Sequence, residues 1–154
     1  MVGYKISSAT TTELYEHLAA CDDNFIPPLS PRIAMREYAE KIAEHSITFE
    51  AWQKTVLVGL IAAYVNDPHN KTAFITNVSV VKEYMGKGIA SELMERLIDY
   101  LAEKKFTGIS LEVHKTNQQA IQFYKKFNFE QDGSREDFLI MKKDQVGPFN
   151  LKKH

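Results

Sequence analysis

The chain has 154 residues, of which 44% are apolar and 25% are charged, and its formal net charge is −1. These values are ordinary for one globular domain, so they argue against a disordered chain and against a small disulfide-stapled scaffold. The near-zero charge provides no basic field of the kind that neutralises nucleic-acid phosphates, so we expect no nucleic-acid partner.

Targeting and redox signals are equally sparse. Cys21 is the only cysteine, so no internal disulfide and no multi-thiolate metal site can be assembled from this chain. No apolar run reaches the roughly 18 residues of a membrane helix, and the first residues lack the apolar stretch of a signal peptide. We therefore expect a cytoplasmic protein with no membrane partner and no metal.

The first third of the chain predicts two helices. Thr10 offers a hydroxyl cap and Glu13 a carboxylate three residues later, ahead of apolar positions at helical spacing. After a turn-rich stretch, Ser30 can cap a second helix and Pro31 can occupy its first position. We expect this second helix to run to about His45.

The rest of the chain alternates between strand and helix signals. A long helix is predicted over 89–104, where apolar side chains recur every four residues, and a shorter one over 117–127. Runs of β-branched and aromatic residues predict the strands. These strands are expected at 4–7, 47–52, 55–65, 73–80, 109–113 and 138–141, with Phe129 beside the last.

The predicted order is β-α-α-β-β-β-α-β-α-β-β. Antiparallel hairpins followed by a β-α-β crossover imply an α/β (α+β) fold, in which a mixed sheet has helices on both faces. We expect one domain over residues 1–145 and a loosely held basic tail over 146–154. Oligomeric state is not legible, although an exposed closing strand such as Phe138–Met141 could pair across a homodimer.

A glycine-containing loop lies between a predicted strand and the long helix. Backbone N–H groups at a helix start have no partner within the helix and favour an anion. Two glycines permit positive φ angles and close approach by a phosphate. The alternative is a glycine turn that merely begins a helix. The residues expected at the phosphates are Met85, Gly86, Lys87, Gly88, Ile89 and Ala90.

This segment resembles motif A of the GNAT family of N-acetyltransferases, a Q/R-x-x-G-x-G/A loop that follows a strand and opens a helix. The family has Gln or Arg at the first position, where this chain has Met85. The resemblance implies acetyl-CoA as cosubstrate, with its pyrophosphate on the loop. It also implies a splayed pair of parallel strands, with Val78 and Val80 pairing through their main chain with the pantetheine arm. The alternative for both valines is a purely structural place in the core.

A second resemblance covers residues 117–129. Asn117 and Tyr124 are two helical turns apart, with the small Ala120 between them, so we expect all three on one helix face. The segment is similar to motif B of the same family, which implies that Asn117 contacts the cofactor and that Tyr124 stands near the sulfur. For an arbitrary tyrosine, a core position would be the simpler interpretation.

Acetyl transfer to an amine needs an acid and a base. Tyrosine, with an ordinary pKa of about 10, stays protonated at neutral pH and can protonate a departing thiolate, so Tyr124 is the predicted acid. Glu112 is the predicted base. His114 is a further candidate, Glu50 and Asp67 are weaker ones, and a water chain is the alternative. No catalytic cysteine is needed, which favours direct transfer in a ternary complex.

In this family the acceptor is selected by the first two helices and the loop between them. Here Phe25, Arg32 and Tyr38 could shape a pocket for a small amine, such as an amino sugar, because rings stack on sugars and arginine donates several hydrogen bonds. The same residues could instead be loop packing. The rival hypotheses are a protein or peptide N-acetyltransferase of the same fold and a non-catalytic acyl-CoA-binding module.

Overall fold

The computed structural model describes residues 1–67 and 69–144. A seven-stranded sheet has the order β1-β2-β3-β4-β5-β7-β6, and β4 and β5 are its parallel pair, the others being antiparallel. This confirms the mixed, mostly antiparallel sheet. The predicted tail over 146–154 lies outside the described residues. The strands are Gly3–Ile6 (β1), Ile47–Gln53 (β2), Val56–Tyr64 (β3), Thr72–Val80 (β4), Gly108–His114 (β5), Glu130–Arg135 (β6) and Phe138–Lys143 (β7).

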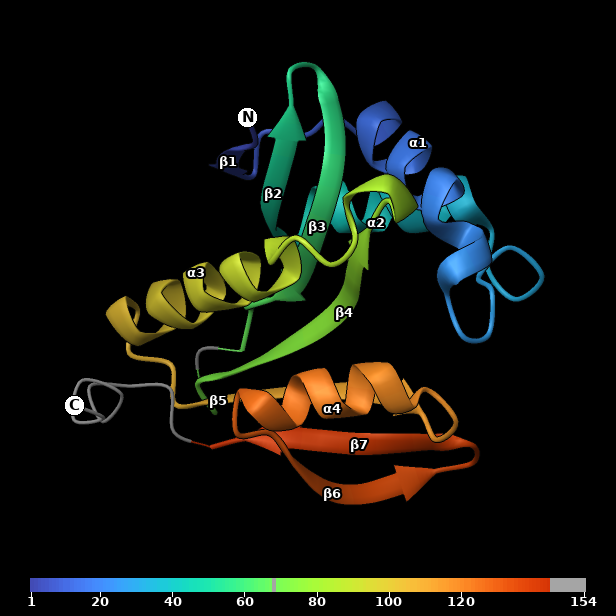
Figure 1. Cartoon of the computed structure of the whole chain (residues 1–154). Helices are drawn as coiled ribbons and strands as arrows, with labels where there is room; N and C mark the ends of the chain where they lie inside the picture. The colour runs from blue at the N-terminus through green and yellow to red at the C-terminus, as the bar shows by residue number, and fades with distance from the viewer. Residues whose placement is uncertain (68, 145–154) are drawn as a thin grey trace.

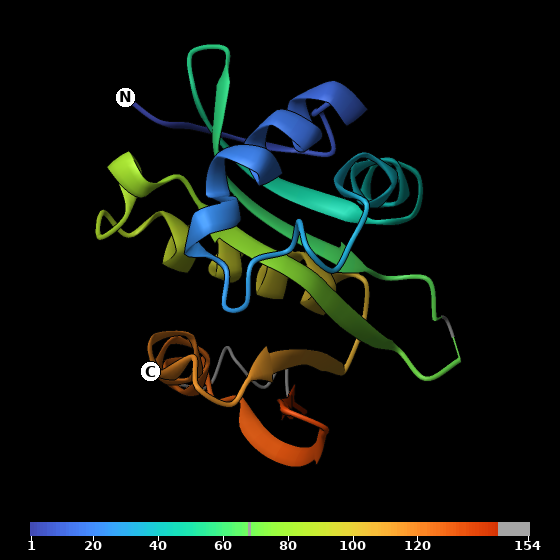
Figure 2. The same ribbon diagram turned by 90° about the vertical axis from the view of Figure 1, so that its right-hand side faces the viewer.

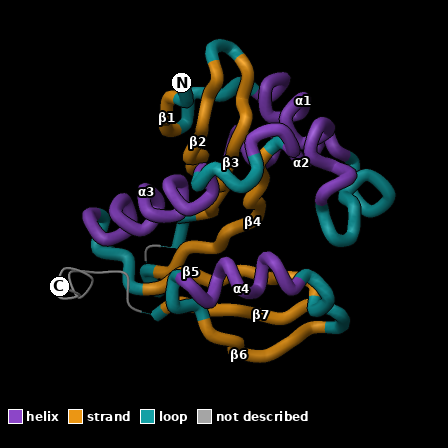
Figure 3. The backbone as a smooth tube through the Cα atoms, in the orientation of Figure 1, coloured by secondary structure: helices purple, strands orange, loops and turns teal. Residues whose placement is uncertain are grey.

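Helices cover both faces of the sheet, as predicted. Figures 1 and 3 show α3 and α4 on one side, and Figure 2 shows α1 and α2 across the first four strands from α3. Each pair has its own buried apolar cluster. No helix in the described ranges is long and apolar enough to span a membrane. The helices are Thr11–Cys21 (α1), Met35–His45 (α2), Ile89–Glu103 (α3) and Gln118–Lys126 (α4).

The two N-terminal helices begin differently. Thr10 caps α1 and forms the expected reciprocal capping box with Glu13. The prediction that α2 starts at Ser30 and Pro31 is wrong, because α2 begins at Met35. The Asp22 carboxylate accepts the backbone N–H groups of Leu29 and Ser30, at 2.8 and 3.0 Å. Those bonds hold the segment as a turn rather than as a helix start.

The last strands differ from the prediction in their order. β7 pairs with β5 on one side and with β6 on the other, so Phe138–Met141 is an interior strand and not a free edge. The edge strand is β6, Glu130–Arg135, whose residues are all exposed. Its charged side chains and Gly133 discourage pairing with another sheet. The suggested dimer contact through Phe138–Met141 is therefore wrong.

Strand β4 loses its β5 neighbour part-way along its length, and the alternation of its side chains shifts at the same place. It pairs with β5 only over Thr72–Ile75, after which no pairing with β5 is found in the described chain. Beyond that point the two strands diverge (Figure 1). An irregularity opposite Ala62 and Ala63 places one extra residue in β4 between Ile75 and Asn77. Because side chains alternate along a strand, this bulge reverses which positions face each side.

The start of α3 is held close to the sheet. A Cβ on Gly59, in the middle of β3, would lie 2.6 Å from the Ile89 side chain at the first position of α3, and 3.3 Å from the Ala51 Cβ. Only glycine therefore allows this approach without displacing the helix. The packing fixes the loop that precedes α3 against the centre of the sheet.

Candidate active site

The loop from Met85 to Gly88 presents an uncapped helix start. Gly86 and Gly88 have φ angles of +77° and +82°, which glycine adopts at little cost. Gly88 is the N-cap of α3 and makes no side-chain cap; the first backbone bond back to it comes from Glu92 N–H. Nothing lies within 4 Å of a Cβ placed on either glycine. These backbone donors thus face open space, as an anion site requires.

Beyond the bulge, β4 presents different side chains to the two faces of the sheet. Val78 and Val80 pack against the cluster that contains α3 and α4, whereas Asn77 and Ser79 face α1. The backbone edge of residues 76–80 has no β5 partner in the described chain. An extended ligand could use that edge while the valine side chains remain in the core. The structure is thus compatible with both interpretations of the valines.

Tyr124 lies on the α3/α4 face. Its side chain is 8% exposed and packs edge-on against Phe123 and at a tilt against Phe129, with ring centroids 5.5 and 5.7 Å apart. No protein hydrogen bond to its hydroxyl is found among the described residues. Burial raises the pKa of Tyr124 well above its ordinary value of 10. The phenol is therefore protonated at neutral pH and has a proton to donate.

Asn117 is not within the helix as predicted but is its N-cap. Its Oδ1 accepts the backbone N–H of Ala120 at 3.2 Å, and its own N–H donates to the His114 carbonyl at 2.9 Å. The side-chain oxygen is thus committed to holding the start of α4. The amide NH₂ remains as the group with which Asn117 could reach a cofactor.

Glu112 is in an ion pair that the sequence did not predict. Arg135, on β6, lies 2.7 and 3.3 Å from the two Glu112 carboxylate oxygens. Leu111 and Val113 belong to the same apolar cluster as Tyr124, so Glu112 projects to the opposite face of β5. The predicted acid and base therefore lie on opposite faces of the sheet. A ligand bound between β4 and β5, where the strands diverge, would be accessible to side chains from both faces of the sheet.

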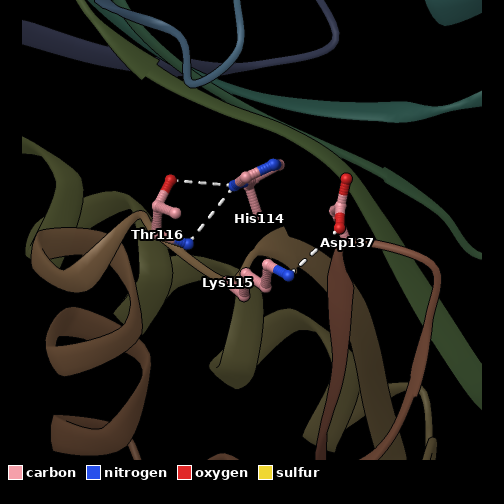
Figure 4. A network of polar contacts seen from close by, with 4 residues as sticks. All are labelled: His114, Lys115, Thr116 and Asp137. Atoms are coloured by element: carbon pink, nitrogen blue, oxygen red, sulfur yellow. Dashed lines mark hydrogen bonds and ion pairs between the residues drawn. The ribbon is translucent and has the colours of Figure 1, made fainter.

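His114 lies one alternation beyond Glu112. Figure 4 shows its ring beside Thr116, whose backbone N–H and hydroxyl lie 3.2 and 2.8 Å from Nδ1. Because a backbone N–H can only donate, Nδ1 accepts, and the neutral ring carries its proton on Nε2. That tautomer makes Nε2 a donor rather than a base. The neighbouring Lys115 pairs with Asp137 at 3.2 Å.

The two weaker base candidates are already hydrogen bonded. Glu50 is fully buried and accepts from Trp52, Thr48, Ser8 and Ala9. Asp67 accepts the Asn70 backbone N–H and side-chain amide, both at 3.1 Å. Because these donors already occupy both carboxylates, neither is well placed to accept a proton from a substrate.

The predicted acceptor residues divide into one fixed anchor and two loop residues. The Tyr38 hydroxyl donates to the Thr76 carbonyl at 2.8 Å and lies 2.7 Å from its Oγ1, so α2 is tied to the β4 bulge. The Arg32 guanidinium donates to two loop carbonyls and lies 5.9 Å from the centre of the Phe138 ring on β7. Phe25 is partly buried against the α1/α2 cluster. The loop thus reaches across to the strands beyond the divergence.

Comparison with known proteins identifies the family. The family model described as "Acetyltransferase (GNAT) family" matches residues 11–129. The chain belongs to the GNAT family. The match covers α1 through α4 and includes the glycine loop, the divergent end of β4 and Tyr124.

Curated relatives match over shorter segments. An N-alpha-acetyltransferase MAK3 of Arabidopsis thaliana is 34% identical over 85 residues, which is 54% of this chain and 44% of the relative. A probable spermine N(1)-acetyltransferase of Bacillus subtilis subsp. natto is 32% identical over 78 residues, 50% of this chain and 51% of the relative. The chain therefore spans about half the length of these relatives.

A solved structure shares the GNAT fold over nearly the whole domain. The PaiA N-acetyltransferase of Thermoplasma acidophilum, solved in complex with coenzyme A, superposes with a TM-score of 0.74 at 18% identity. The alignment covers 92% of this chain and 99% of that one. At this identity the likeness establishes the fold. That neighbour's bound coenzyme A makes acetyl-CoA the natural cosubstrate to test here.

Two features of the site were missed from the sequence. The β4 bulge has a signal: the apolar side chains of β4 that pack against α3 and α4 are Ala73 and Ile75, then Val78 and Val80, so the alternation shifts by one residue. The Glu112–Arg135 pair had no such signal, because the two residues are 23 positions apart and no periodicity would bring them together.

Proposed function

We propose that this GNAT protein transfers the acetyl group of acetyl-CoA to the primary amine of a small molecule, by direct attack in a ternary complex. The observation that carries the proposal is the divergence of β4 from β5 after Ile75. The uncapped glycine loop lies at the end of the same strand, with Tyr124 on one face of the diverging pair and Glu112 on the other.

The α3/α4 face supplies the cofactor contacts in this proposal. The N–H groups from Gly86 to Ala90 bind the pyrophosphate, and the dipole of α3 adds to their attraction for negative charge. The unpaired edge of residues 76–80 hydrogen-bonds the pantetheine amides as an added strand would. Asn117 contributes its amide NH₂ from the start of α4.

The opposite face supplies the amine and removes its proton. A protonated amine has no lone pair, so Glu112 accepts its proton through a water molecule while Arg135 holds the carboxylate in place. The amine nitrogen then attacks the acetyl carbonyl carbon. That attack forms the C–N bond. Collapse of the tetrahedral intermediate then restores the C=O bond and breaks the C–S bond, so the electron pair leaves on sulfur, and the surplus proton on nitrogen passes through water to the thiolate.

Tyr124 stabilises that departing sulfur. An alkyl thiol has a pKa of about 8.5, whereas burial raises the pKa of Tyr124 above its ordinary 10. The phenol is thus a weaker acid than the thiol, and complete proton transfer is uphill. Tyr124 therefore acts as a hydrogen-bond donor that stabilises the developing thiolate.

Support for an amino sugar as acceptor comes from the residues beside the divergence. The Phe138 ring has the Arg32 Cζ atom 5.9 Å from its centroid and the His114 ring centroid 5.2 Å away, in an edge-on contact. An aromatic face with adjacent N–H donors suits a hydroxylated ring. Tyr38 supports this wall through its bonds to Thr76 rather than through a free hydroxyl.

A peptide amine is the second candidate acceptor, because one relative is named an N-alpha-acetyltransferase. The two candidates are separated by incubating the full chain with acetyl-CoA and panels of amino sugars, polyamines and peptides, with free thiol release as the readout. We expect the highest kcat/KM for an amino sugar. A peptide that exceeded every small amine by tenfold or more would move the assignment to the second candidate.

Calorimetry with acetyl-CoA tests the cofactor half separately. We expect a micromolar dissociation constant, corresponding to about 8 kcal/mol of binding free energy. Binding without thiol release for any amine would leave a non-catalytic acyl-CoA-binding module. Lack of binding at tens of times that concentration would exclude both functions.

A further inference from the structure

A row of buried polar groups crosses the α1/α2 face of the sheet. His17, in the middle of α1, is 3% exposed, and its Nδ1 lies 2.9 Å from the Leu57 carbonyl on β3. Its Nε2 lies 2.8 Å from the Ser79 hydroxyl on β4, which in turn lies 2.8 Å from Asn77 Oδ1. Ser79 and Asn77 are 6% and 7% exposed. The row therefore joins α1 to two strands without reaching bulk water.

The row continues to α2. The Tyr38 hydroxyl donates to the Thr76 carbonyl at 2.8 Å and lies 2.7 Å from Thr76 Oγ1. Thr76 directly precedes Asn77 in β4, so Tyr38 is attached next to the contacts that run from His17 through Ser79 to Asn77. Both helices of the acceptor side are attached to the same short stretch of β4.

That stretch is the part of β4 that has lost its β5 partner. Its pairing with β5 stops at Ile75, and the bulge lies between Ile75 and Asn77. A strand without a neighbour on one side needs other contacts to fix its backbone. On the α1/α2 face the row provides them, and it does so with directional bonds that apolar packing would lack.

The direction of these bonds is set by His17. A carbonyl can only accept, so Nδ1–H donates to Leu57 and the neutral ring presents a lone pair at Nε2. Burial lowers the pKa of His17 to about 4, so the ring is neutral at physiological pH. Asn77 Oδ1 also lies 2.8 Å from the Ser79 oxygen, so the single Ser79 proton is shared between the two acceptors, Nε2 and Oδ1.

We propose that His17 is a positioning residue for acetyl transfer, acting through Ser79 and Asn77 to hold the divergent end of β4 and to set α1 and α2 as the acceptor wall. The inference rests on the proposed function. The row binds β4 through side chains on the α1/α2 face, whereas the cofactor is held by the glycine loop and by the β4 backbone edge, so loss of the row should act more on the acceptor than on CoA.

Ser79→Ala is the first test, because it removes the hydroxyl with little change in volume. We expect the KM for the best amine to rise about tenfold, the equivalent of one buried hydrogen bond, while the Kd for CoA stays within twofold. Ser79→Thr, which restores a hydroxyl, should return the KM to within about threefold of the wild-type value. His45→Gln, at an exposed histidine that ends α2, is the unaffected control.

The double variant Ser79→Ala/Tyr38→Phe tests whether the contacts form one row. Residues in one network are non-additive, so the two substitutions together should raise the KM by much less than the product of their separate factors. A fully multiplicative increase would show two independent contacts and would overturn the inference. So would a Ser79→Ala variant whose Kd for CoA rises as much as its acceptor KM.

Hydrogen exchange separates failure of this inference from failure of the proposed function. If the wild-type chain acetylates no amine, the proposed function fails, but the row still predicts that Ser79→Ala increases amide exchange in both α1 and α2. Ser79 lies on β4, so an effect on α2 must pass along β4 through Asn77 and Thr76 to Tyr38. Unchanged exchange in α2 would overturn the inference whether or not activity is found.

Discussion

The two faces of the sheet are built on different chemistry. The α3/α4 face carries the larger apolar cluster, and the groups proposed to hold the cofactor there are mostly backbone N–H and C=O. The α1/α2 face buries several polar side chains, each with partners. The buried polar side chains of the α1/α2 face are His17, Thr48, Glu50, Asn77 and Ser79.

The difference suggests a division of labour. Every GNAT protein must hold a similar cofactor, and backbone groups suffice for it because they depend on glycine and on strand divergence rather than on particular side chains. An acceptor wall must be shaped for one substrate and needs side chains fixed in place. Substitutions on the α1/α2 face should therefore act first on stability and acceptor recognition, and those on the α3/α4 face on the cofactor and turnover.

The largest effect is expected at Glu50. Its carboxylate accepts a 2.5 Å bond from Thr48, a 3.0 Å bond from Trp52 Nε1 and three bonds from the segment that leads into α1. Glu50→Ala leaves these donors without a partner, at a cost of about 4 kcal/mol in the free energy of unfolding. Urea denaturation monitored by Trp52 fluorescence measures it.

Glu44→Ala is the matched control, because Glu44 is exposed and its one ion pair within the described residues is with His45, at 3.7 Å. It should change the free energy of unfolding by less than about 0.5 kcal/mol. If Glu50→Ala were equally mild, the buried polar groups of the α1/α2 face would not fix its structure, and the contrast between the faces would disappear.

This contrast also explains what the sequence could predict. Periodicity located nearly all the helices and strands. The conformation of the loop with Gly86 and Gly88 was predictable because it depends on local sequence, while its role in binding stays a prediction. The start of α2 was misplaced because Asp22, seven residues before Leu29, competes for the N–H groups that a helix start would leave free. The bond between His17 and Ser79 joins residues 62 apart, and no local pattern encodes it.

The second largest effect concerns pH. Burial lowers the pKa of His17 to about 4 from 6.5, so between these values the unfolded chain binds a proton that the folded chain does not. The contribution of the neutral His17 ring to the free energy of unfolding is present in full above pH 6.5 and is lost as the pH falls toward 4. At 1.36 kcal/mol per pKa unit, this loss in the free energy of unfolding approaches roughly 3 kcal/mol. Denaturant midpoints at several pH values measure it.

Other titratable groups lie near His17. Cys21 lies 3.7 Å from Nε2, and burial raises the pKa of its thiol to about 12, so it stays protonated throughout. The carboxylates of Glu13 and Glu16 line the same small pocket as His17. His17→Gln should therefore flatten the curve between pH 6.5 and 5, whereas His45→Gln should leave the slope unchanged. Equal slopes for both variants would assign the pH dependence to other groups.

On the opposite face, Tyr124→Phe should act on turnover rather than on stability. Removing the hydroxyl leaves the ring packing with Phe129 intact but deletes the donor to the departing sulfur. We expect kcat to fall roughly a hundredfold and the Kd for CoA to stay within twofold. Tyr15→Phe, at a ring stacked beneath Arg36, is the control. Unchanged turnover in Tyr124→Phe would remove its role as the acid.

The smallest effect is expected at Gly88. With φ at +82° and nothing within 4 Å of an added Cβ, Gly88→Ala introduces backbone strain but no clash, at about 1–2 kcal/mol. Relaxation of the loop to relieve that strain misaligns the N–H donors, so the affinity for CoA should fall roughly tenfold by calorimetry. Gly133→Ala, with φ at +125° on the exposed edge strand, carries comparable strain and should leave CoA binding unchanged. If both substitutions left the affinity intact, the glycine loop would be only a helix start, and the cofactor contacts would have to come from side chains after all.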